Sequence, residues 1–388
     1  MSFYKEAKPI KKVFFCGFDD LFLFLGIAFF PLYLFDSGNI QLAHFFLISF
    51  SIFVVLKFGF YCGGWFFLLF SLSFYVFFVE FYYLCFGGGY NYLINPAYMF
   101  YNLFVVMAVY VYCRSNGLSF IFLGLAFAAL IIFFVIVYDG FSFRGENAVR
   151  VKATFNNPNQ LGYFSVCFFS MSYLLFRHSY INSFFACVLL SFSCFLSIVS
   201  LSKAAILSNF IASVFLIGYC FLKIMDSGLF KIRNLFYFFV FSSLFIYFVF
   251  LGNSLGDFYF VERFSKMAEE SDSSLESRGY FAFKEGTVDQ IIFGLGENEV
   301  LKIVGHEVHS TLGSIFNNYG AVGFLIFLFV LFLWFLNLWK AYGFVGMFCL
   351  VGPVILYGVT HNGIRFTLFW ILFGSSMAMA DSINKIKK

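Results

Sequence analysis

The longest hydrophilic stretch of the chain, residues 252–310, contains two histidines, His306 and His309. Histidine is the natural general base near neutral pH. The same stretch carries five cations (Arg263, Lys266, Arg278, Lys284 and Lys302). This combination suits a site where cations hold an anionic substrate and a histidine accepts a proton. A His-x-x-His spacing without a cysteine partner is a weak zinc signal, so we expect no metal. A solvated helix face is the alternative explanation for Arg278.

A second polar segment begins at Arg150-Val151-Lys152 and continues through Asn156, Asn157 and Asn159 around Pro158. Asn-Pro is a turn signal. Three asparagines and two cations are more polar than a simple connection needs. We interpret the segment as a turn that faces a ligand, with Arg150, Asn157 and Asn159 as binding residues. The alternative is the capped start of a helix with stray charges.

Three further residues stand out near the ends of apolar runs. Lys203 follows Ser202 at the start of a run, where the helix dipole disfavours a cation; snorkelling to lipid headgroups is the alternative. Arg365 lies inside a run, where an unpaired charge is costly, so it is a binding candidate with Glu80 as a plausible partner. His361, beside Asn362, competes with His309 for the role of base.

The composition indicates the environment of these residues. Of 388 residues, 62% are hydrophobic and only 11% are charged. A soluble domain has about half and about a quarter, respectively. Long apolar runs, rather than short alternating strands, predict an all-α polytopic transmembrane helix bundle. The sequence shows about twelve runs: 20–36, 40–56, 64–86, 97–113, 118–138, 161–177, 180–200, 204–222, 232–251, 311–337, 343–358 and 362–380.

The distribution of charge predicts the orientation. Both termini are basic and the number of runs is even, which places both ends in the cytoplasm. Short turns on the other side, near 37–39, 87–96 and 359–361, contain no Lys or Arg. We therefore expect one integral membrane domain with nine spans in 1–251, a large periplasmic loop in 252–310 and three spans in 311–388.

The periplasmic loop has its own helical pattern. Ser273 and Ser274 are candidate caps for an amphipathic helix over residues 275–290, lying on the outer membrane surface. Gly294-Leu295-Gly296 is expected to end that helix before the histidine segment.

Several cations at one water–lipid boundary suit a phosphate or diphosphate, because guanidinium forks bind such groups bidentately. A diphosphate departs readily from a sugar. The chemistry then needs cations for the leaving group and a base for the acceptor hydroxyl. No nucleotide or metal motif is visible, which suits a lipid-linked donor used outside the cytoplasm, with no cofactor.

Short motifs in the chain resemble those of the O-antigen polymerase (Wzy) and O-antigen ligase superfamily of bacterial membrane glycosyltransferases. The similar residues are Arg150 with Thr154–Gly162, Ser202-Lys203-Ala204, Ser277-Arg278-Gly279 with Gly294-Leu295-Gly296, and His309-Ser310 with Tyr319-Gly320 and Gly323-Phe324. Two departures are Lys203, where the family often has arginine, and Ser310, where it often has asparagine.

The resemblance implies metal-independent, inverting transfer of sugar from an undecaprenyl diphosphate-linked oligosaccharide at the periplasmic face of the bacterial inner membrane. It assigns the diphosphate to Arg150, Lys203 and Arg278, and the role of base to His309. The function favoured is polymerisation of repeat units, with a chain-length regulator as a candidate partner. Ligation of glycan to lipid A–core is the alternative. A flippase or transporter is disfavoured because charges are sparse in the inner halves of the runs, and we expect no nucleic-acid partner.

Overall fold

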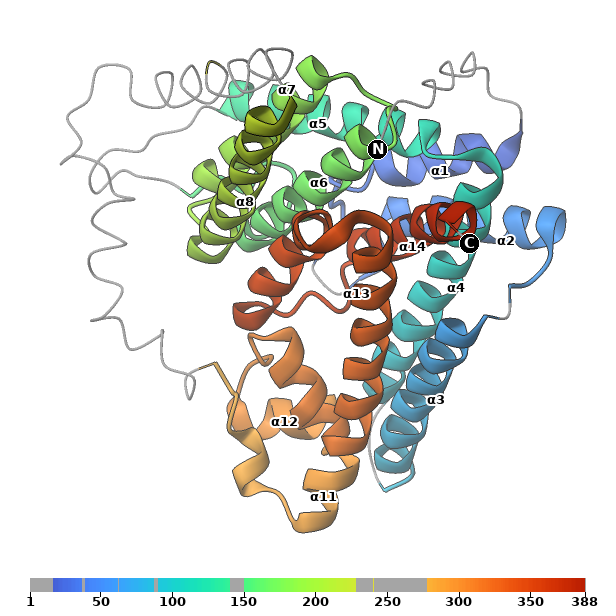
Figure 1. Cartoon of the computed structure of the whole chain (residues 1–388). Coiled ribbons are helices and arrows are strands. Elements are labelled where there is room, and N and C mark those ends of the chain that lie inside the picture. The colour runs from blue at the N-terminus through green and yellow to red at the C-terminus, as the bar shows by residue number, and fades with distance from the viewer. Residues whose placement is uncertain are drawn as a thin grey trace.

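The structure is a computed structural model that describes residues 17–36, 39–61, 63–86, 90–139, 150–227, 240 and 278–387. These residues form helices and connections, without a strand among them. Figure 1 shows their arrangement. The elements are α1 (Phe18–Ala28), α2 (Leu42–Phe58), α3 (Gly64–Cys85), η1 (Tyr90–Leu93), α4 (Ile94–Asn116), α5 (Ser119–Asp139), α6 (Pro158–Arg177), α7 (Ser183–Val199), α8 (Lys203–Ser227), η7 (Ala282–Glu285), α11 (Val288–Phe293), α12 (Glu297–Val304), α13 (Thr311–Thr360) and α14 (Thr367–Lys387).

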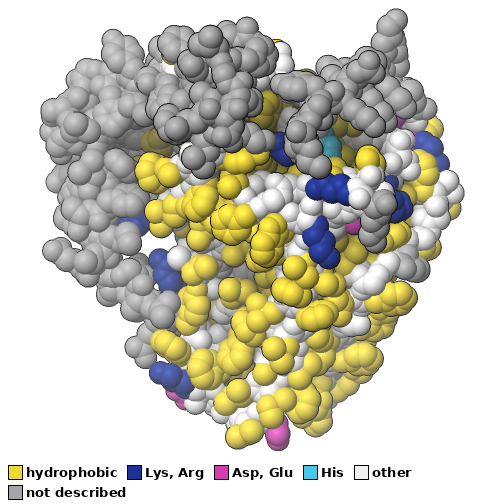
Figure 2. Space-filling view, in the orientation of Figure 1, with side chains coloured by type: hydrophobic (Ala, Val, Ile, Leu, Met, Phe, Trp, Pro, Cys, Tyr) yellow, Lys and Arg dark blue, Asp and Glu magenta, His cyan; other side chains and the backbone are white. Residues whose placement is uncertain are grey.

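Four helices in the described part of the chain are long and apolar enough to cross a membrane: α3, α4, α5 and α13. Large aromatic side chains such as Phe78 and Phe134 are 61% and 65% exposed, as expected for surfaces that face lipid rather than water. On the face shown in Figure 2, hydrophobic side chains cover most of the described surface and charged ones are few. The all-helical, membrane-type fold expected from the composition is therefore confirmed in its coarse form.

Every second connection between consecutive helices lies at one end of the bundle, which we call the site end. Asn156 Nδ2 donates to Phe35 O at 2.9 Å, which joins the α1–α2 connection to the segment before α6. Tyr83, near the end of α3, donates from its hydroxyl to Gly294 O at 3.1 Å. Asn95, near the start of α4, accepts from Arg365 Nε at 2.8 Å just before α14. The chain thus returns to this end after every second helix.

The remaining helix ends lie at the opposite end of the bundle, which we call the far end. Lys57 at the end of α2 pairs with Asp19 at the start of α1, at 2.8 Å. Tyr110 near the end of α4 donates to Asp381 near the end of α14, at 2.5 Å. Lys387 Nζ donates to Lys340 O at 2.8 Å. These contacts match the alternation expected for consecutive spans.

Residues 278–310 form a small cap on the site end, which contains η7, α11 and α12. Figure 1 shows α11 and α12 beside the ends of α3 and α13. The core of the cap has only four buried hydrophobic residues: Ala282, Leu295, Val300 and Val308. The Asn317 side chain adds a tie, because its Nδ2 donates to Gly279 O and Tyr280 O, both at 3.2 Å.

The cap is held to α13 through a break in that helix at Gly320. Gly320 has φ +63°, so the helix is interrupted there and nearby carbonyls are released. Leu295 N donates to Asn317 O at 3.2 Å and Gly296 N donates to Asn318 O at 2.8 Å. Gly294 and Gly296 were expected to end a helix, and both have positive φ. Helix α11 does end at Phe293, directly before them.

Three sequence predictions need correction. The helix predicted over 275–290 is wrong in its described part, because Gly279 has φ +74° and a capping box at Thr287 starts a separate helix. The break predicted at 337–341 lies instead at Gly343, whose φ is +74°. The first run, 20–36, gives an α-helix only to Ala28. The predicted run 232–251 and the caps Ser273 and Ser274 lie outside the described residues, except Val240.

The two glycine breaks of α13 give a matched test of the cap's attachment. A Cβ at Gly320 would lie 2.4 Å from Ile292 O, whereas a Cβ at Gly343 would meet nothing within 4 Å. Both alanine variants incur a cost of about 1–3 kcal/mol, because both glycines combine positive φ with ψ near 180°, a conformation essentially restricted to glycine. Only Gly320→Ala also collides with the cap backbone. We expect Gly320→Ala to lower the unfolding temperature in detergent further than Gly343→Ala, and to speed proteolysis within 278–310. Equal losses in the two variants would contradict this attachment.

Candidate active site

The start of α6 is organised by Asn157 and Asn159. Asn157 is the N-cap, with its side chain accepting from Asn159 N at 2.8 Å, and Pro158 occupies the first helical position. Arg150 Nη2 donates to Asn159 Oδ1 at 2.7 Å, and Arg150 Nε donates to Ser200 O at 3.3 Å. Asn157 therefore serves as a helix cap, the role left open as the alternative, while Arg150 is fixed beside the same helix start.

The junction between α7 and α8 packs against this segment. Val151 N donates to Val199 O at 3.1 Å. Leu201 has φ +49°, a strained turn that ends α7 before Lys203 begins α8. Gly162 of α6 allows the close approach, because a Cβ there would lie 2.9 Å from Ser202 Cβ. The half-buried Lys203 thus begins α8 three residues after Ser200, whose carbonyl accepts from Arg150.

The end of α13 lies beside the start of α6. Tyr357 donates from its hydroxyl to Asn159 O at 2.6 Å. Its ring stacks on His361, with centroids 4.6 Å apart and planes 22° from parallel. The Tyr357 ring also stacks on Tyr163, with centroids 4.8 Å apart. This aromatic stack sets His361 beside the start of α6.

Arg278 and His309 join the site from the cap. Arg278 Nη1 donates to Thr360 O at 2.8 Å, at the last residue of α13. His309 N donates to Arg278 O at 3.1 Å, so the two residues lie together. The His309 ring is stacked with His306 at 5.0 Å.

The electrostatics of His361 reflect this convergence. Burial and, in decreasing order, the nearby charges of Arg278, His309 and Arg150 together lower its pKa from 6.5 to about 3. Three residues singled out in two separate polar segments of the sequence thus act on one imidazole. We call Arg150, Lys203, Arg278, His309 and His361 the cationic site.

The two candidate bases differ in their surroundings. His361 is a poor proton acceptor near neutral pH, because its pKa lies near 3. Its Nδ1 is also engaged with Thr360 Oγ1 at 3.0 Å. His309 is exposed, with its backbone held by Arg278. Of the two candidate bases, His309 is thus the exposed one, whereas His361 is buried and engaged.

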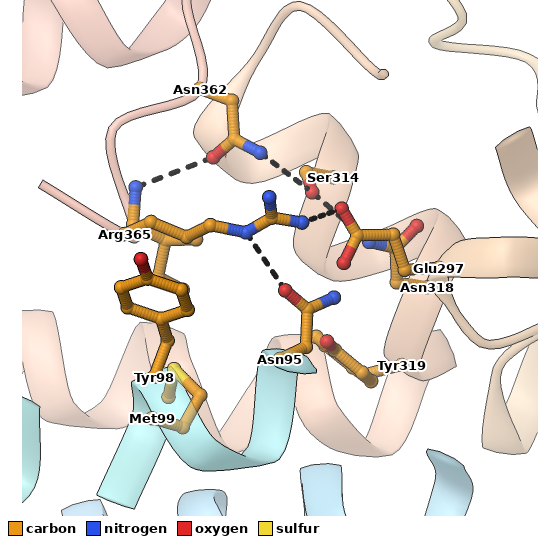
Figure 3. A pocket seen from close by; sticks show the side chains of 10 residues that line it. Asn95, Tyr98, Met99, Glu297, Ser314, Asn318, Tyr319, Asn362 and Arg365 are labelled. Atoms are coloured by element: carbon orange, nitrogen blue, oxygen red, sulfur yellow. Dashed lines mark hydrogen bonds and ion pairs between the residues drawn. The ribbon is translucent and has the colours of Figure 1, made fainter. Parts of the chain in front are cut away.

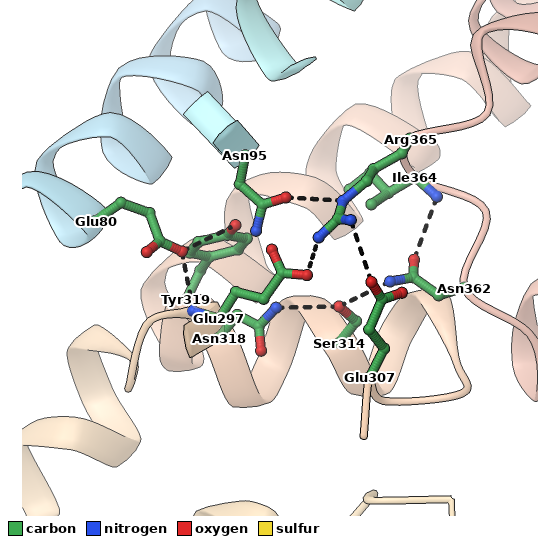
Figure 4. A network of polar contacts seen from close by, with 10 residues as sticks. All are labelled: Glu80, Asn95, Glu297, Glu307, Ser314, Asn318, Tyr319, Asn362, Ile364 and Arg365. Carbon is green, nitrogen blue, oxygen red and sulfur yellow. Dashed lines mark hydrogen bonds and ion pairs between the residues drawn. The ribbon is translucent and has the colours of Figure 1, made fainter. Parts of the chain in front are cut away.

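Arg365 lies beside the cationic site but in a different environment. Its guanidinium pairs with Glu297, and Nη1 contacts Glu307 Oε1 at 3.2 Å. The direct pair with Glu80 suggested by the sequence is not among the described ion pairs. Instead Glu80 Oε1 accepts from Glu297 N at 2.9 Å, so the two residues belong to one network through Glu297 (Figure 4).

The sequence reasoning did not single out three members of this network: the amide of Asn95, the carboxylate of Glu297 and the hydroxyl of Ser314. Glu297 follows directly on Gly294-Leu295-Gly296, and a carboxylate in the first turn of a helix is a recognisable feature. No local signal links it to Arg365, 68 residues away. Among the described residues no three His, Cys, Asp or Glu side chains gather as metal ligands.

No protein-family model matches the chain, and no curated protein matches it either.

The buried neutral state of His361 predicts an acid-dependent loss of stability. In the unfolded chain the imidazole takes up a proton near pH 6.5, whereas in the folded protein it does so only near pH 3. Stability supported by the neutral ring is therefore present above pH 6.5 and is lost as the pH falls toward 3. Unfolding temperatures of the wild type and His361→Gln, measured from pH 7.5 to 4, should show a shallower decline for the variant. Parallel curves would contradict the assignment.

Proposed function

We propose that the protein is a metal-independent, inverting glycosyltransferase that polymerises undecaprenyl diphosphate-linked oligosaccharide repeat units. The observation that supports this most is the convergence of Arg150, Arg278 and His309 on His361 at one end of a bundle of apolar helices. Cations at the end of a lipid-facing bundle suit a diphosphate whose chain lies in the bilayer. The motif resemblance points to the same chemistry.

The reaction assigned to the cationic site is a displacement at the anomeric carbon. The acceptor hydroxyl oxygen attacks that carbon, and the bond from the carbon to the diphosphate oxygen breaks with its electron pair. Arg150, Lys203 and Arg278 stabilise the charge on the departing diphosphate. His309 accepts the proton of the acceptor hydroxyl. The products are the extended glycan and undecaprenyl diphosphate, so charge and atoms balance.

The proposed setting is the bacterial inner membrane, with about twelve spans and both termini in the cytoplasm. The far end carries Lys57, Arg114, Arg177, Lys340, Lys385 and Lys387. The short site-end connections, 29–41 and 86–93, contain no Lys or Arg, so these cations of the far end favour a cytoplasmic location for that end. The site end, with its cap, is then periplasmic, where lipid-linked repeat units are joined. A chain-length regulator is the protein partner proposed.

Replacing a cation at each end of the bundle tests the proposed role. Arg278→Ala removes a guanidinium from the cationic site, whereas Arg114→Ala removes one from the exposed far end of α4. We expect Arg278→Ala to reduce glycan chain extension at least about 100-fold, because the developing diphosphate charge loses a preorganised donor. Arg278→Lys should retain part of the activity. Arg114→Ala should extend glycan normally.

The measurement is a gel of surface glycan from a deletion strain complemented with each variant at matched membrane levels. Full extension with Arg278→Ala would refute the assignment. The uncomplemented deletion strain distinguishes the acceptors. Lipid A–core carrying one repeat indicates a polymerase, whereas bare core with accumulated lipid-linked polymer indicates a ligase. An unaltered glycan ladder would overturn both.

A further inference from the structure

A small cleft lined by polar and apolar side chains lies next to the cationic site. It is bounded by the start of α4, the start of α12, the first turns of α13 and the loop before α14 (Figure 3). The side chains that line it and carry the argument are Asn95, Tyr98, Glu297, Ser314, Asn318 and Arg365. They combine amides, hydroxyls and charged groups at hydrogen-bonding distance from one another.

The charge of this cleft differs from that of the cationic site. Arg365 pairs with both Glu297 and Glu307, and its Nε donates to Asn95 Oδ1 at 2.8 Å. Two carboxylates against one guanidinium leave no surplus positive charge for a diphosphate. Arg365 was predicted from the sequence to bind substrate. We now expect it to contact an uncharged, hydrogen-bonding part of that substrate.

Asn318, which lines the cleft, has one unsatisfied buried group. Its side chain is 3% exposed, and its Nδ2 donates to Ser314 Oγ at 3.2 Å. Its Oδ1 has no hydrogen-bond partner among the described residues. A buried amide oxygen without a donor costs stability. A ligand hydroxyl or amide that donates to this oxygen would remove that cost.

We propose that the cleft binds sugar hydroxyls of the lipid-linked glycan, as a carbohydrate subsite distinct from the diphosphate-binding cations. This inference rests on the proposed glycosyltransferase function. Carboxylate and amide oxygens accept hydrogen bonds from hydroxyls, and amide and guanidinium groups donate to them. The Tyr98 ring adds an apolar surface of the kind that ligand pockets combine with a few polar groups.

The subsite is continuous with the cationic site. His361 and Asn362 are adjacent in the chain; the former belongs to the cationic site, and the latter lines the cleft. Asn362 Nδ2 donates to Ser314 Oγ at 3.2 Å, the hydroxyl that Asn318 also contacts. A sugar held in the cleft would therefore present its glycosidic end beside Arg278 and His309. The two regions divide recognition between the glycan and its diphosphate.

Binding measurements on the full-length protein in lipid nanodiscs can separate the two regions. The probes are the repeat-unit oligosaccharide released from its lipid carrier and undecaprenyl diphosphate without sugar. Asn318→Leu should weaken oligosaccharide binding about tenfold, the scale expected for one lost buried hydrogen bond with its desolvation, and leave undecaprenyl diphosphate binding unchanged. Arg278→Ala should show the reverse pattern. Asn116→Leu, an exposed asparagine at the other end of α4, should affect neither.

Ser314→Ala is the smaller change to use if Asn318→Leu does not fold, because it removes the hydroxyl shared by Asn318 and Asn362. It should weaken oligosaccharide binding selectively as well. Equal loss of both probes in folded variants, or unchanged oligosaccharide binding, would overturn the subsite.

The wild type distinguishes the two proposals. Binding of undecaprenyl diphosphate without any binding of the oligosaccharide would overturn the subsite alone. Binding of the oligosaccharide without undecaprenyl diphosphate would support a carbohydrate cleft and overturn the proposed function. Failure to bind either probe would overturn both.

Discussion

Peptide groups at the ends of apolar helices must find hydrogen-bond partners, and the residues of the candidate site supply many of them. Arg278 donates to the last carbonyl of α13, and Arg150 donates to the carbonyl of Ser200 after α7. Asn157 caps the start of α6, and Tyr357 donates to a carbonyl in its first turn. In an apolar surrounding each unsatisfied group costs several kcal/mol. The same side chains thus close the helices and form the site.

The arrangement also separates two kinds of electrostatic environment within a short stretch of chain. On one side of the loop before α14, Arg150, Arg278 and His309 act on a buried imidazole that stays neutral well below neutral pH. On the other side, Arg365 is neutralised by Glu297 and Glu307. Such a division suits a substrate with one strongly anionic part and one polar, uncharged part.

The sequence predicts the helices well because each apolar run is a local feature. The run 64–86 becomes α3 (Gly64–Cys85), and the run 118–138 becomes α5 (Ser119–Asp139). The gathering of Arg150, Arg278 and His309 follows from alternation, since consecutive spans return their connections to one side. Interruptions are harder to predict. Neither Gly320 nor Gly343 differs in local sequence from the other glycines of the chain, and only contacts with the cap explain why α13 breaks at the first.

The partners of Arg365 show where sequence reasoning fails. An intramembrane arginine requires a counter-charge, and Glu80 was the nearest choice by depth along the spans. The structure supplies Glu297 and Glu307 instead, from a cap whose path depends on two glycine turns. Asn-Pro suits both a ligand-facing turn and a helix cap; the bond to Asn159 N shows that Asn157 is a cap, and its binding role stays a prediction.

The cap illustrates how a segment exposed to water can depend on the lipid-embedded part of its own chain. Four buried hydrophobic residues are too few to fold a 33-residue fragment (278–310) by themselves, and its glycine turns need the carbonyls that α13 releases at Gly320. A synthetic peptide of these residues would therefore be largely unstructured in solution. Antibodies raised against that peptide would recognise the denatured protein far better than the native one.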